Sequence, residues 1–328
     1  MNKMRAVVLD GPGPVSSLQI REIQKPRARD GWVLLKVMAF GLNRSELHTR
    51  LGLAGPDVTF PRVLGIEAAG FIEAAPETRF KEGAKAVAIM GGMGRSFDGG
   101  YAEFTLVPET NVISVETDLD WTRLGALPEV LQTAWGSLHV GVDLNAGDHL
   151  LVRGGTSSVG LMSAILAKRL GAIVIATTRQ KERAQRLREC GVDHVLIDDG
   201  KVAAAVRAIC PDGVDGAIEL IGAPTLRDTL QSCRKGGTTC FTGMLSNQWI
   251  IDQFYPIEFI PTGVRLTAYG GGASDLPSAV LSEIADSIHR GEIHWPVKAY
   301  TMDEIAQAHD DMEHNRVIAK QVVLTGKT

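Results

Sequence analysis

The second half of the chain alternates short apolar runs with segments of helical spacing, and this rhythm constrains the fold more than any other feature. Apolar runs at 149–153 (HLLVR), 172–178 (AIVIATT) and 216–221 (GAIELI) are each followed by a segment whose apolar residues recur at helical intervals. Two such segments stop at Gly171 and Gly191, and glycine is preferred just beyond a helix end. Strand–helix–strand units of this kind predict an α/β fold with a doubly wound parallel sheet.

The residues on either side of this block follow a different rhythm. Before Trp121 the chain carries short strand-like runs divided by Gly, Pro and Asp, which is typical of a β-rich domain with few long helices. The last part of the chain is too short to bury a core of its own, so we expect it to return to the first domain. The predicted organisation is a β-rich domain at 1–123, an inserted α/β domain at 124–261 and the returning part of the β-rich domain at 262–328.

Composition excludes several classes of protein. With 328 residues, 45% hydrophobic and 22% charged, the chain suits two soluble globular domains. A net charge of −4 gives no basic field for nucleic acid. No window approaches the roughly 18 unbroken apolar residues of a membrane helix, the N-terminus lacks a signal-peptide core, and the cysteines show no CxxC spacing. We therefore expect a cytoplasmic protein that binds neither nucleic acid nor membrane.

A turn rich in small residues, GGTSSVG at 154–160, joins the first strand of the block to its helix. Small residues let the backbone approach a pyrophosphate, which is stabilised by the amides and dipole of the helix N-terminus. Gly155 and Gly160 fit the outer positions of a GxGxxG pattern, but Ser157 takes the middle one. The alternative is a structural turn with a helix cap at Ser157 or Ser158. The cofactor interpretation assigns contacts to Gly155, Thr156, Ser157, Ser158, Val159 and Gly160.

The end of the next strand indicates which dinucleotide the turn binds. About 20 residues past the turn, an NAD-binding fold places an acidic residue for the ribose 2′-hydroxyl. This chain has Thr178, Arg179, Lys181 and Arg183 in that region and no acid at the strand end. Guanidinium and hydroxyl groups suit a 2′-phosphate, so the cofactor predicted is NADPH, with Thr178, Arg179 and Arg183 as contacts. The alternative is a solvated basic start to a helix.

Five further segments carry motifs: GLNRSELHTRLG, PRVLGIEAAGFIE, DGGYAEF, LPEVLQTAWGSL and MEHNRVIAKQVVL, at 41–52, 61–73, 98–104, 127–138 and 312–324. With the turn, they resemble the zinc-independent quinone oxidoreductase branch of the medium-chain dehydrogenase/reductase superfamily over almost the whole chain. The resemblance implies a Rossmann domain inserted in a split GroES-like β-rich domain. It also implies a homodimer joined through the edges of the Rossmann sheets, for which residues 264–271 (VRLTAYGG) would supply the edge.

The same resemblance bears on metal binding. Zinc-dependent relatives hold a catalytic zinc by a cysteine, a histidine and a third cysteine or acid, and the matching positions here are Asn43, Ile66 and Glu129. A neutral amide and an isoleucine are unsuited to zinc. No cysteine precedes Cys190, so the structural zinc of those relatives has no ligands either. We therefore expect no metal.

The resemblance assigns further roles by position. Asn43 matches the asparagine beside the nicotinamide, and Ser45 and His48 match a proton relay; the alternatives are a turn-stabilising asparagine and a structural histidine. Thr133 is placed near the nicotinamide ribose, or else it bonds its own helix. Glu67 is either a supporting acid or the partner of Arg62 or Arg44. Cofactor contacts also follow for Thr242, Gly243, Met244 and Asn315, Lys320 is placed on the cofactor side, and Tyr269 lines either the acceptor pocket or a dimer contact.

The function predicted is hydride transfer from NADPH to a quinone or an α,β-unsaturated carbonyl compound, both small molecules. Without zinc to polarise an alcohol, reduction of an electron-poor acceptor remains accessible. One alternative is an enoyl-thioester reductase, which needs a basic approach for carrier phosphates, for example from Arg44, Arg50 and Arg62. Another is a non-catalytic NADPH-binding sensor.

Overall fold

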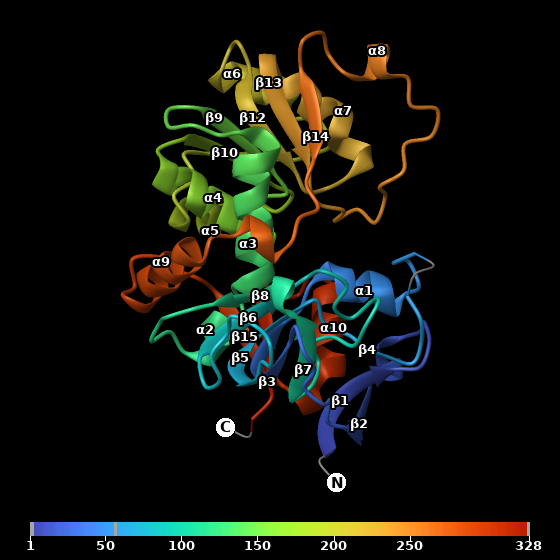
Figure 1. Cartoon of the computed structure of the whole chain (residues 1–328). Helices are drawn as coiled ribbons and strands as arrows, with labels where there is room; N and C mark the ends of the chain where they lie inside the picture. The colour runs from blue at the N-terminus through green and yellow to red at the C-terminus, as the bar shows by residue number, and fades with distance from the viewer. Residues whose placement is uncertain (1–2, 56–57, 327–328) are drawn as a thin grey trace. The chain divides into compact units, whose positions relative to one another are not determined.

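The computed structural model describes residues 3–55 and 58–326, and the chain divides into two compact units (Figure 1). One comprises Met1–Glu129 and Gly272–Thr328, and the other comprises Val130–Gly271. The end of the chain therefore shares a unit with its beginning, which confirms that an α/β domain is inserted in a split β-rich one. No helix in the described part of the chain has both the length and the apolar character that crossing a membrane requires.

The inserted unit is built on one parallel six-stranded sheet. Its strand order is β11-β10-β9-β12-β13-β14, the 3-2-1-4-5-6 order of the Rossmann fold. The strands are β9 (His149–Arg153), β10 (Ile173–Thr178), β11 (His194–Ile197), β12 (Val214–Glu219), β13 (Cys233–Phe241) and β14 (Arg265–Ala268). Because β14 pairs with β13 in register from Thr238 and Arg265, this unit continues past residue 261, where the sequence pattern became irregular.

Helices cover this sheet, as the alternating pattern requires. They are α4 (Ser158–Leu170), α5 (Ala184–Glu189), α6 (Ala203–Ile209) and α7 (Ala223–Ser232), while the short α8 (Pro256–Phe259) lies in the loop between β13 and β14. The chain enters the unit through α3 (Pro128–Gly136), which continues as a π-helical segment at Ser137–Val142. Helix α4 packs on β9 and β10, and α7 packs on β12 and β13 (Figure 1). Leu150, Leu151 and Val152 in the central strand are all 0% exposed, which is why that strand reads as a continuous apolar run.

The β-rich unit contains a seven-stranded sheet, ordered β15-β16-β3-β5-β6-β8 with β7 paired to β3, and a three-stranded sheet, ordered β2-β1-β4. Its strands are β1 (Lys3–Leu9), β2 (Gln19–Gln24), β3 (Trp32–Gly41), β4 (Arg62–Val63), β5 (Glu67–Ala74), β6 (Lys85–Ile89), β7 (Phe104–Pro108), β8 (Val112–Ser114), β15 (Val297–Thr301) and β16 (Lys320–Leu324). Its helices are α1 (Arg44–Arg50), α2 (Trp121–Leu124), α9 (Ser278–His289) and α10 (Ile305–Glu313).

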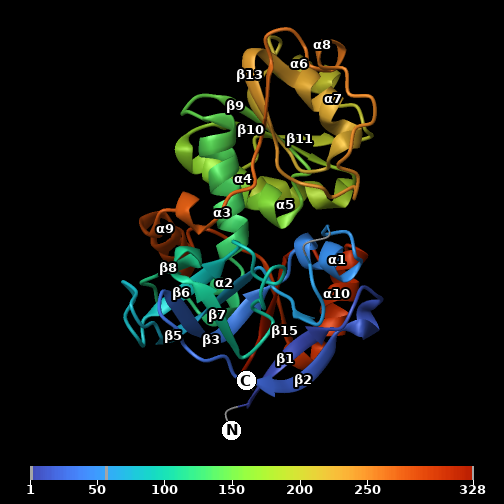
Figure 2. The same ribbon diagram turned by 45° about the vertical axis from the view of Figure 1, so that its right-hand side comes forward.

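The tail of the chain is tied into this unit by strand pairing. Strand β16 runs antiparallel to β3, with Val322 opposite Gly41. In both views α10, from the end of the chain, lies beside α1, from near its start (Figures 1 and 2). The pairing of β16 with β3 brings Lys320 to the same end of the sheet as the residues that follow β3.

Candidate active site

A tight turn joins β9 to α4, and its glycines are required for two reasons: the backbone conformation at Gly154, and the lack of space for a side chain at Gly155 and Gly160. Gly154 has a φ of +85°, a conformation that other residues rarely adopt. A Cβ on Gly155 would lie 2.9 Å from the Ala176 Cβ, and one on Gly160 would lie 2.6 Å from the Gly154 carbonyl oxygen. Strand and helix therefore approach each other closely at this turn, as the outer positions of a GxGxxG pattern require.

Ser157, in the middle position of that pattern, is the N-cap of α4. Its Oγ accepts a hydrogen bond from the Gly160 N–H at 3.1 Å and donates one to the Gly154 carbonyl oxygen at 2.9 Å. The hydroxyl thus performs the capping role that the sequence offered as the alternative. Because the first N–H groups of a helix have no carbonyl partner within it, those of Ser158 and Val159 are the best placed to receive an anion.

Strand β10, next to the turn, ends in two buried threonines followed by basic residues. Thr177 Oγ1 accepts a hydrogen bond from the Gly154 N–H at 3.0 Å, so β10 holds the turn directly. Thr178 Oγ1 donates to the Gln180 carbonyl oxygen at 3.1 Å and accepts from the Gln180 N–H at 3.2 Å. Arg179 is exposed and Arg183 is half-buried. The structure therefore brings Arg179 to the same carboxyl edge of the sheet as the turn, and its contact with a 2′-phosphate stays a prediction.

The residues after β13 lie at the same edge of the sheet. The N–H groups of Thr242 and Gly243 both donate to the Glu219 carbonyl oxygen at 3.0 Å. A Cβ on Gly243 would lie 2.6 Å from the Leu220 carbonyl oxygen, so this loop lies tightly against the end of β12. The Met244 side chain is 36% exposed and remains available to a ligand.

Ser137, which the sequence analysis did not single out, connects two of the predicted cofactor residues. Its Oγ donates to the Thr133 carbonyl oxygen at 2.7 Å and lies 2.9 Å from Thr242 Oγ1. Tyr269, which follows β14, is bound to the same helix, because its hydroxyl accepts a hydrogen bond from Gln132 Nε2 at 2.5 Å. The only sequence signal for Ser137 was its place one helical turn after Thr133.

In the β-rich unit, Asn43, Glu67 and Lys320 form a buried polar cluster. Asn43, the N-cap of α1, donates from Nδ2 to Glu67 Oε1 at 2.8 Å, and its Oδ1 accepts from Lys320 Nζ. Lys320 Nζ also lies 2.8 Å from Glu67 Oε1. Lys320 is 2% exposed and Glu67 is 0% exposed, so the ammonium is removed from water and paired with a carboxylate. The partner of Glu67 is therefore Lys320, and the sequence alternatives of Arg62 and Arg44 were wrong.

A second carboxylate, that of Glu46, closes the cluster. It is 1% exposed and accepts hydrogen bonds from the N–H groups of Asn43 and Ile66, both at 2.8 Å. Burial raises the pKa of Glu46 to about 7; the hydrogen bond from Ile66 and the charge of Lys320 oppose that rise, and the charge of Glu67 adds to it. The site thus contains a carboxyl group that changes charge near neutral pH.

We expect Glu46→Gln to remove part of the pH dependence of stability. Because the folded-state pKa of about 7 lies above the ordinary 4.5, the folded protein keeps a proton that the unfolded chain releases, and stability falls as pH rises through that window. Glutamine stays neutral and lacks this loss. Urea unfolding near the two ends of the window measures it: the wild type should lose more unfolding free energy than the variant. Equal losses would show that Glu46 does not hold that proton.

Ser45 and His48 lie on α1, next to Asn43. Arg95 Nη2 donates to Ser45 Oγ at 2.5 Å, and His48 is 6% exposed. His48 is therefore buried while Ser45 is half-buried, and a relay through them would start from a buried imidazole. Their part in proton transfer stays a prediction.

The three arginines that could attract the phosphates of a thioester carrier, Arg44, Arg50 and Arg62, form hydrogen bonds or ion pairs with residues of the β-rich unit. Arg50 is 1% exposed and donates to the Gly13 carbonyl oxygen at 2.6 Å and to Glu313. Arg62 pairs with Asp98 at 3.1 Å. Arg50 is therefore a buried structural residue, and the charge of Arg62 is already compensated. Asn315 accepts a hydrogen bond from Arg44 Nη2 at 2.6 Å, so the structure brings it to α1, and its cofactor role stays a prediction.

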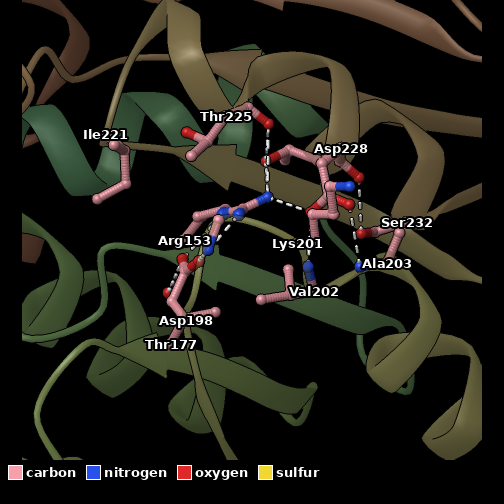
Figure 3. Close-up of polar contacts among 12 residues, drawn as sticks. Arg153, Thr177, Asp198, Lys201, Val202, Ala203, Ile221, Thr225, Asp228 and Ser232 are labelled. Atoms are coloured by element: carbon pink, nitrogen blue, oxygen red, sulfur yellow. Dashed lines mark hydrogen bonds and ion pairs between the residues drawn. The ribbon is translucent and has the colours of Figure 1, made fainter.

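Arg153 is the largest omission of the sequence analysis. It is the last residue of β9, and it is 0% exposed among Asp198, Asp228 and neighbouring threonines (Figure 3). The signal was present in the sequence, since an arginine ends an otherwise apolar run immediately before the turn.

Comparisons with known proteins agree with this architecture. Two family models match: "Alcohol dehydrogenase GroES-like domain" over residues 29–117 and "Zinc-binding dehydrogenase" over residues 158–286. The first confirms the GroES-like nature of the β-rich unit. The chain is 26% identical to a quinone oxidoreductase of Lama guanicoe (98% of this chain and 97% of the relative) and 28% identical to a 2-haloacrylate reductase of Burkholderia sp (98% of each).

Solved structures extend the likeness over the whole fold. The crystal structure of AibC superposes with a TM-score of 0.87 at 28% identity, covering 99% of this chain and 96% of that one. The mycobacterial protein Rv1454c, solved in complex with NADPH, superposes with a TM-score of 0.85 at 25% identity, covering 98% of this chain and 100% of that one.

The positions expected at a zinc site do not suit a metal, although one matching family model is described as zinc-binding. Asn43 Oδ1 is bound by the Lys320 ammonium, Ile66 is apolar, and Glu129 Oε2 lies 3.9 Å from Lys320 Nζ. An ammonium among these groups repels a cation and occupies its acceptors. In residues 3–55 and 58–326, no three His, Cys, Asp or Glu side chains are grouped so as to hold a metal ion.

Proposed function

The chain belongs to the medium-chain dehydrogenase/reductase superfamily, in its quinone oxidoreductase-like branch, and from this we propose that it is an NADPH-dependent, zinc-independent reductase of quinones or α,β-unsaturated carbonyl compounds. Membership makes it an oxidoreductase that binds a nicotinamide cofactor and acts on a small molecule. The choice of NADPH, the acceptor class and the independence from zinc are our proposal.

The observation that carries the proposal is the buried Lys320 ammonium between Asn43 and Glu67. Oxidation of a simple alcohol depends on a group that lowers the pKa of the alcohol, as zinc does. Here the acceptor atoms that such an ion needs are bound to a lysine. Acceptors that are already electron-poor need less activation, and the named relatives include a reductase of quinones and one of a 2-haloacrylate.

The carboxyl edge of the Rossmann sheet supports NADPH as the cofactor. The backbone N–H groups of Ser158 and Val159 suit its pyrophosphate, and Arg179 suits its 2′-phosphate. The residues that end β10 and directly follow it, 177–181, include no acid that could bind a free 2′-hydroxyl or repel a phosphate, and the nearby Asp198 carboxylate is paired with Arg153. When bound, the cofactor supplies the hydride, and the chain supplies binding, orientation and the polar cluster.

An acceptor screen tests this function. The protein is mixed with NADPH and, separately, with ortho- and para-quinones, 2-alkenals and crotonyl-CoA, and the near-ultraviolet absorbance of NADPH is followed. Turnover with quinones or 2-alkenals is the expected result. Turnover with crotonyl-CoA alone would identify a thioester reductase, and tight NADPH binding without turnover of any acceptor would identify a non-catalytic protein.

The metal content gives an independent prediction. We expect the purified protein to contain no stoichiometric zinc and its turnover to survive dialysis against a strong chelator, because Lys320 occupies the acceptor atoms. Atomic emission analysis together with rates before and after chelation measures both. One zinc per chain with chelator-sensitive turnover would contradict the assignment.

A further inference from the structure

We propose that Arg153 is a positioning residue for the dinucleotide, which acts by holding together the loops that follow β9, β11 and β12. The inference rests on the proposed binding of NADPH at the β9–α4 turn. It adds to that binding a buried hydrogen-bond network that fixes the conformation of the loops at the carboxyl edge of the sheet before the cofactor binds.

The guanidinium of Arg153 is fully enclosed, and each of its three nitrogens donates at least one hydrogen bond. Nε and Nη2 donate to the two oxygens of Asp198, each at 2.9 Å, in a fork that matches the planar carboxylate. Nη1 donates to Asp228 (Figure 3). It also donates, at 3.2 Å, to Thr229 Oγ1. Asp198 follows β11, and Asp228 and Thr229 lie on α7. One side chain therefore joins three elements beneath the carboxyl edge of the sheet.

A chain of hydrogen bonds leads from this arginine to the turn. Asp198 Oδ2, which accepts from Arg153, also accepts from Thr177 Oγ1 at 3.2 Å. Thr177 Oγ1 in turn accepts from the Gly154 N–H at 3.0 Å. The first residue of the turn is thus held by a hydroxyl whose proton is directed by the ion pair. A change at Arg153 reaches the turn by this route as well as through the backbone.

The same network fixes the two neighbouring loops. Asp228 Oδ2 accepts from the Val202 N–H at 2.7 Å, at the start of α6. Thr229 Oγ1 lies 2.5 Å from Glu219 Oε2. Glu219 Oε1 accepts from the N–H groups of Ile221 and Gly222 at 2.6 and 3.0 Å, in the loop after β12. The backbone groups of both loops are therefore bound by carboxylates that are linked to Arg153, directly in the case of Asp228 and through Thr229 in the case of Glu219.

Two arguments indicate that this network serves cofactor binding and not stability alone. A buried ionic network is commonly no more stable than apolar side chains of the same volume, and the three residues before Arg153 in the central strand are buried and apolar. The network also lies at the carboxyl edge, where doubly wound sheets bind their ligands, and loops fixed in advance lose less entropy on binding.

The test measures cofactor binding in the folded protein, without an acceptor. The variants are Arg153→Leu and a triple variant, Arg153→Leu with Asp198→Asn and Asp228→Asn, which removes the arginine charge together with the charges of the two carboxylates that contact it. Dissociation constants for NADPH and for 2′,5′-ADP are measured by calorimetry well below the unfolding temperature. We expect both ligands to bind the triple variant about tenfold or more weakly, because misplaced contact groups weaken binding strongly even when they remain present.

Two further variants separate positioning from general damage. Thr177→Val keeps every charge and the side-chain shape but removes the hydroxyl that holds Gly154, and it should weaken both ligands in the same direction. It also carries the test if the Arg153 variants do not fold. Arg234→Met breaks an ion pair with Asp215 near the amino end of the same sheet and should leave binding unchanged.

The outcomes distinguish this inference from the proposed function. Wild-type protein that binds neither ligand would overturn both. Wild-type protein that binds them, with a folded triple variant and Thr177→Val that bind equally well, would overturn the role of Arg153 alone. Weaker binding in these variants with intact folding and an unchanged Arg234→Met control supports it.

Discussion

Arg179→Ala should raise the dissociation constant for NADPH by about ten- to a hundredfold and leave that for NADH nearly unchanged. Arg179 is exposed, one residue past the end of β10 and at the same edge as the Gly154 turn. A charge-assisted hydrogen bond to a phosphate contributes about 1.5–3 kcal/mol, and about 1.4 kcal/mol is a factor of ten in affinity. NADH has only a hydroxyl at that position, so it loses little when the guanidinium is removed.

Binding titrations with both nucleotides measure this selectivity. Arg188→Ala is the matched control, because Arg188 is an exposed arginine further along the same segment and should affect neither cofactor. Since exposed charges are screened by salt, the preference for NADPH should also shrink as ionic strength rises. Equal weakening of both nucleotides by Arg179→Ala would remove this residue from the 2′-phosphate site.

The Rossmann half of the fold could be predicted because its signals are local. From β9 to β13 each strand and helix is marked by a few consecutive residues, and a parallel sheet follows from their alternation, whereas β14 lies where the pattern is irregular. Gly155 and Gly160 were recognisable for the same reason, since their spacing records a close approach of two adjacent segments. The role of Ser157 was left open, because a small residue with a hydroxyl group at the start of a helix is suited both to phosphate binding and to helix capping.

The polar cluster could not be predicted, because its members are joined only by the folded chain. Lys320 and Asn43 are 277 residues apart, and they meet because β16 pairs with β3. The Arg153 network is a milder case. The charge itself is visible in an apolar strand, but Asp198 and Asp228, 45 and 75 residues away, are two acids among 38. A single sequence shows that a buried charge needs a partner without showing which one.

The buried pair at the cluster gives the largest expected effect on stability. Lys320→Met should lower the free energy of unfolding by about 3–5 kcal/mol, because it leaves the Glu67 carboxylate enclosed without a counter-charge. By contrast, Lys3→Met should cost about 1 kcal/mol or less, since Lys3 and Glu22 form an exposed pair in the same unit. Urea unfolding of both variants beside the wild type measures the difference.

A double variant then separates the stabilising role of Lys320 from its role in orienting Asn43. Glu67→Gln removes the charge that Lys320→Met leaves behind, so the double variant should recover most of the lost stability. It should not recover turnover. Methionine cannot donate to Asn43 Oδ1, so the amide is no longer held with its oxygen toward a cation and its nitrogen toward an acceptor.

The decisive comparison in the double variant is between NADPH binding and turnover. NADPH should bind as in the wild type, because the turn and Arg179 lie in the other unit, while kcat with the acceptor found in the screen should fall about tenfold or more. Restored stability together with wild-type kcat would reduce Lys320 to a structural counter-ion. Stability that is not restored would show that more than the Glu67 charge depends on this lysine.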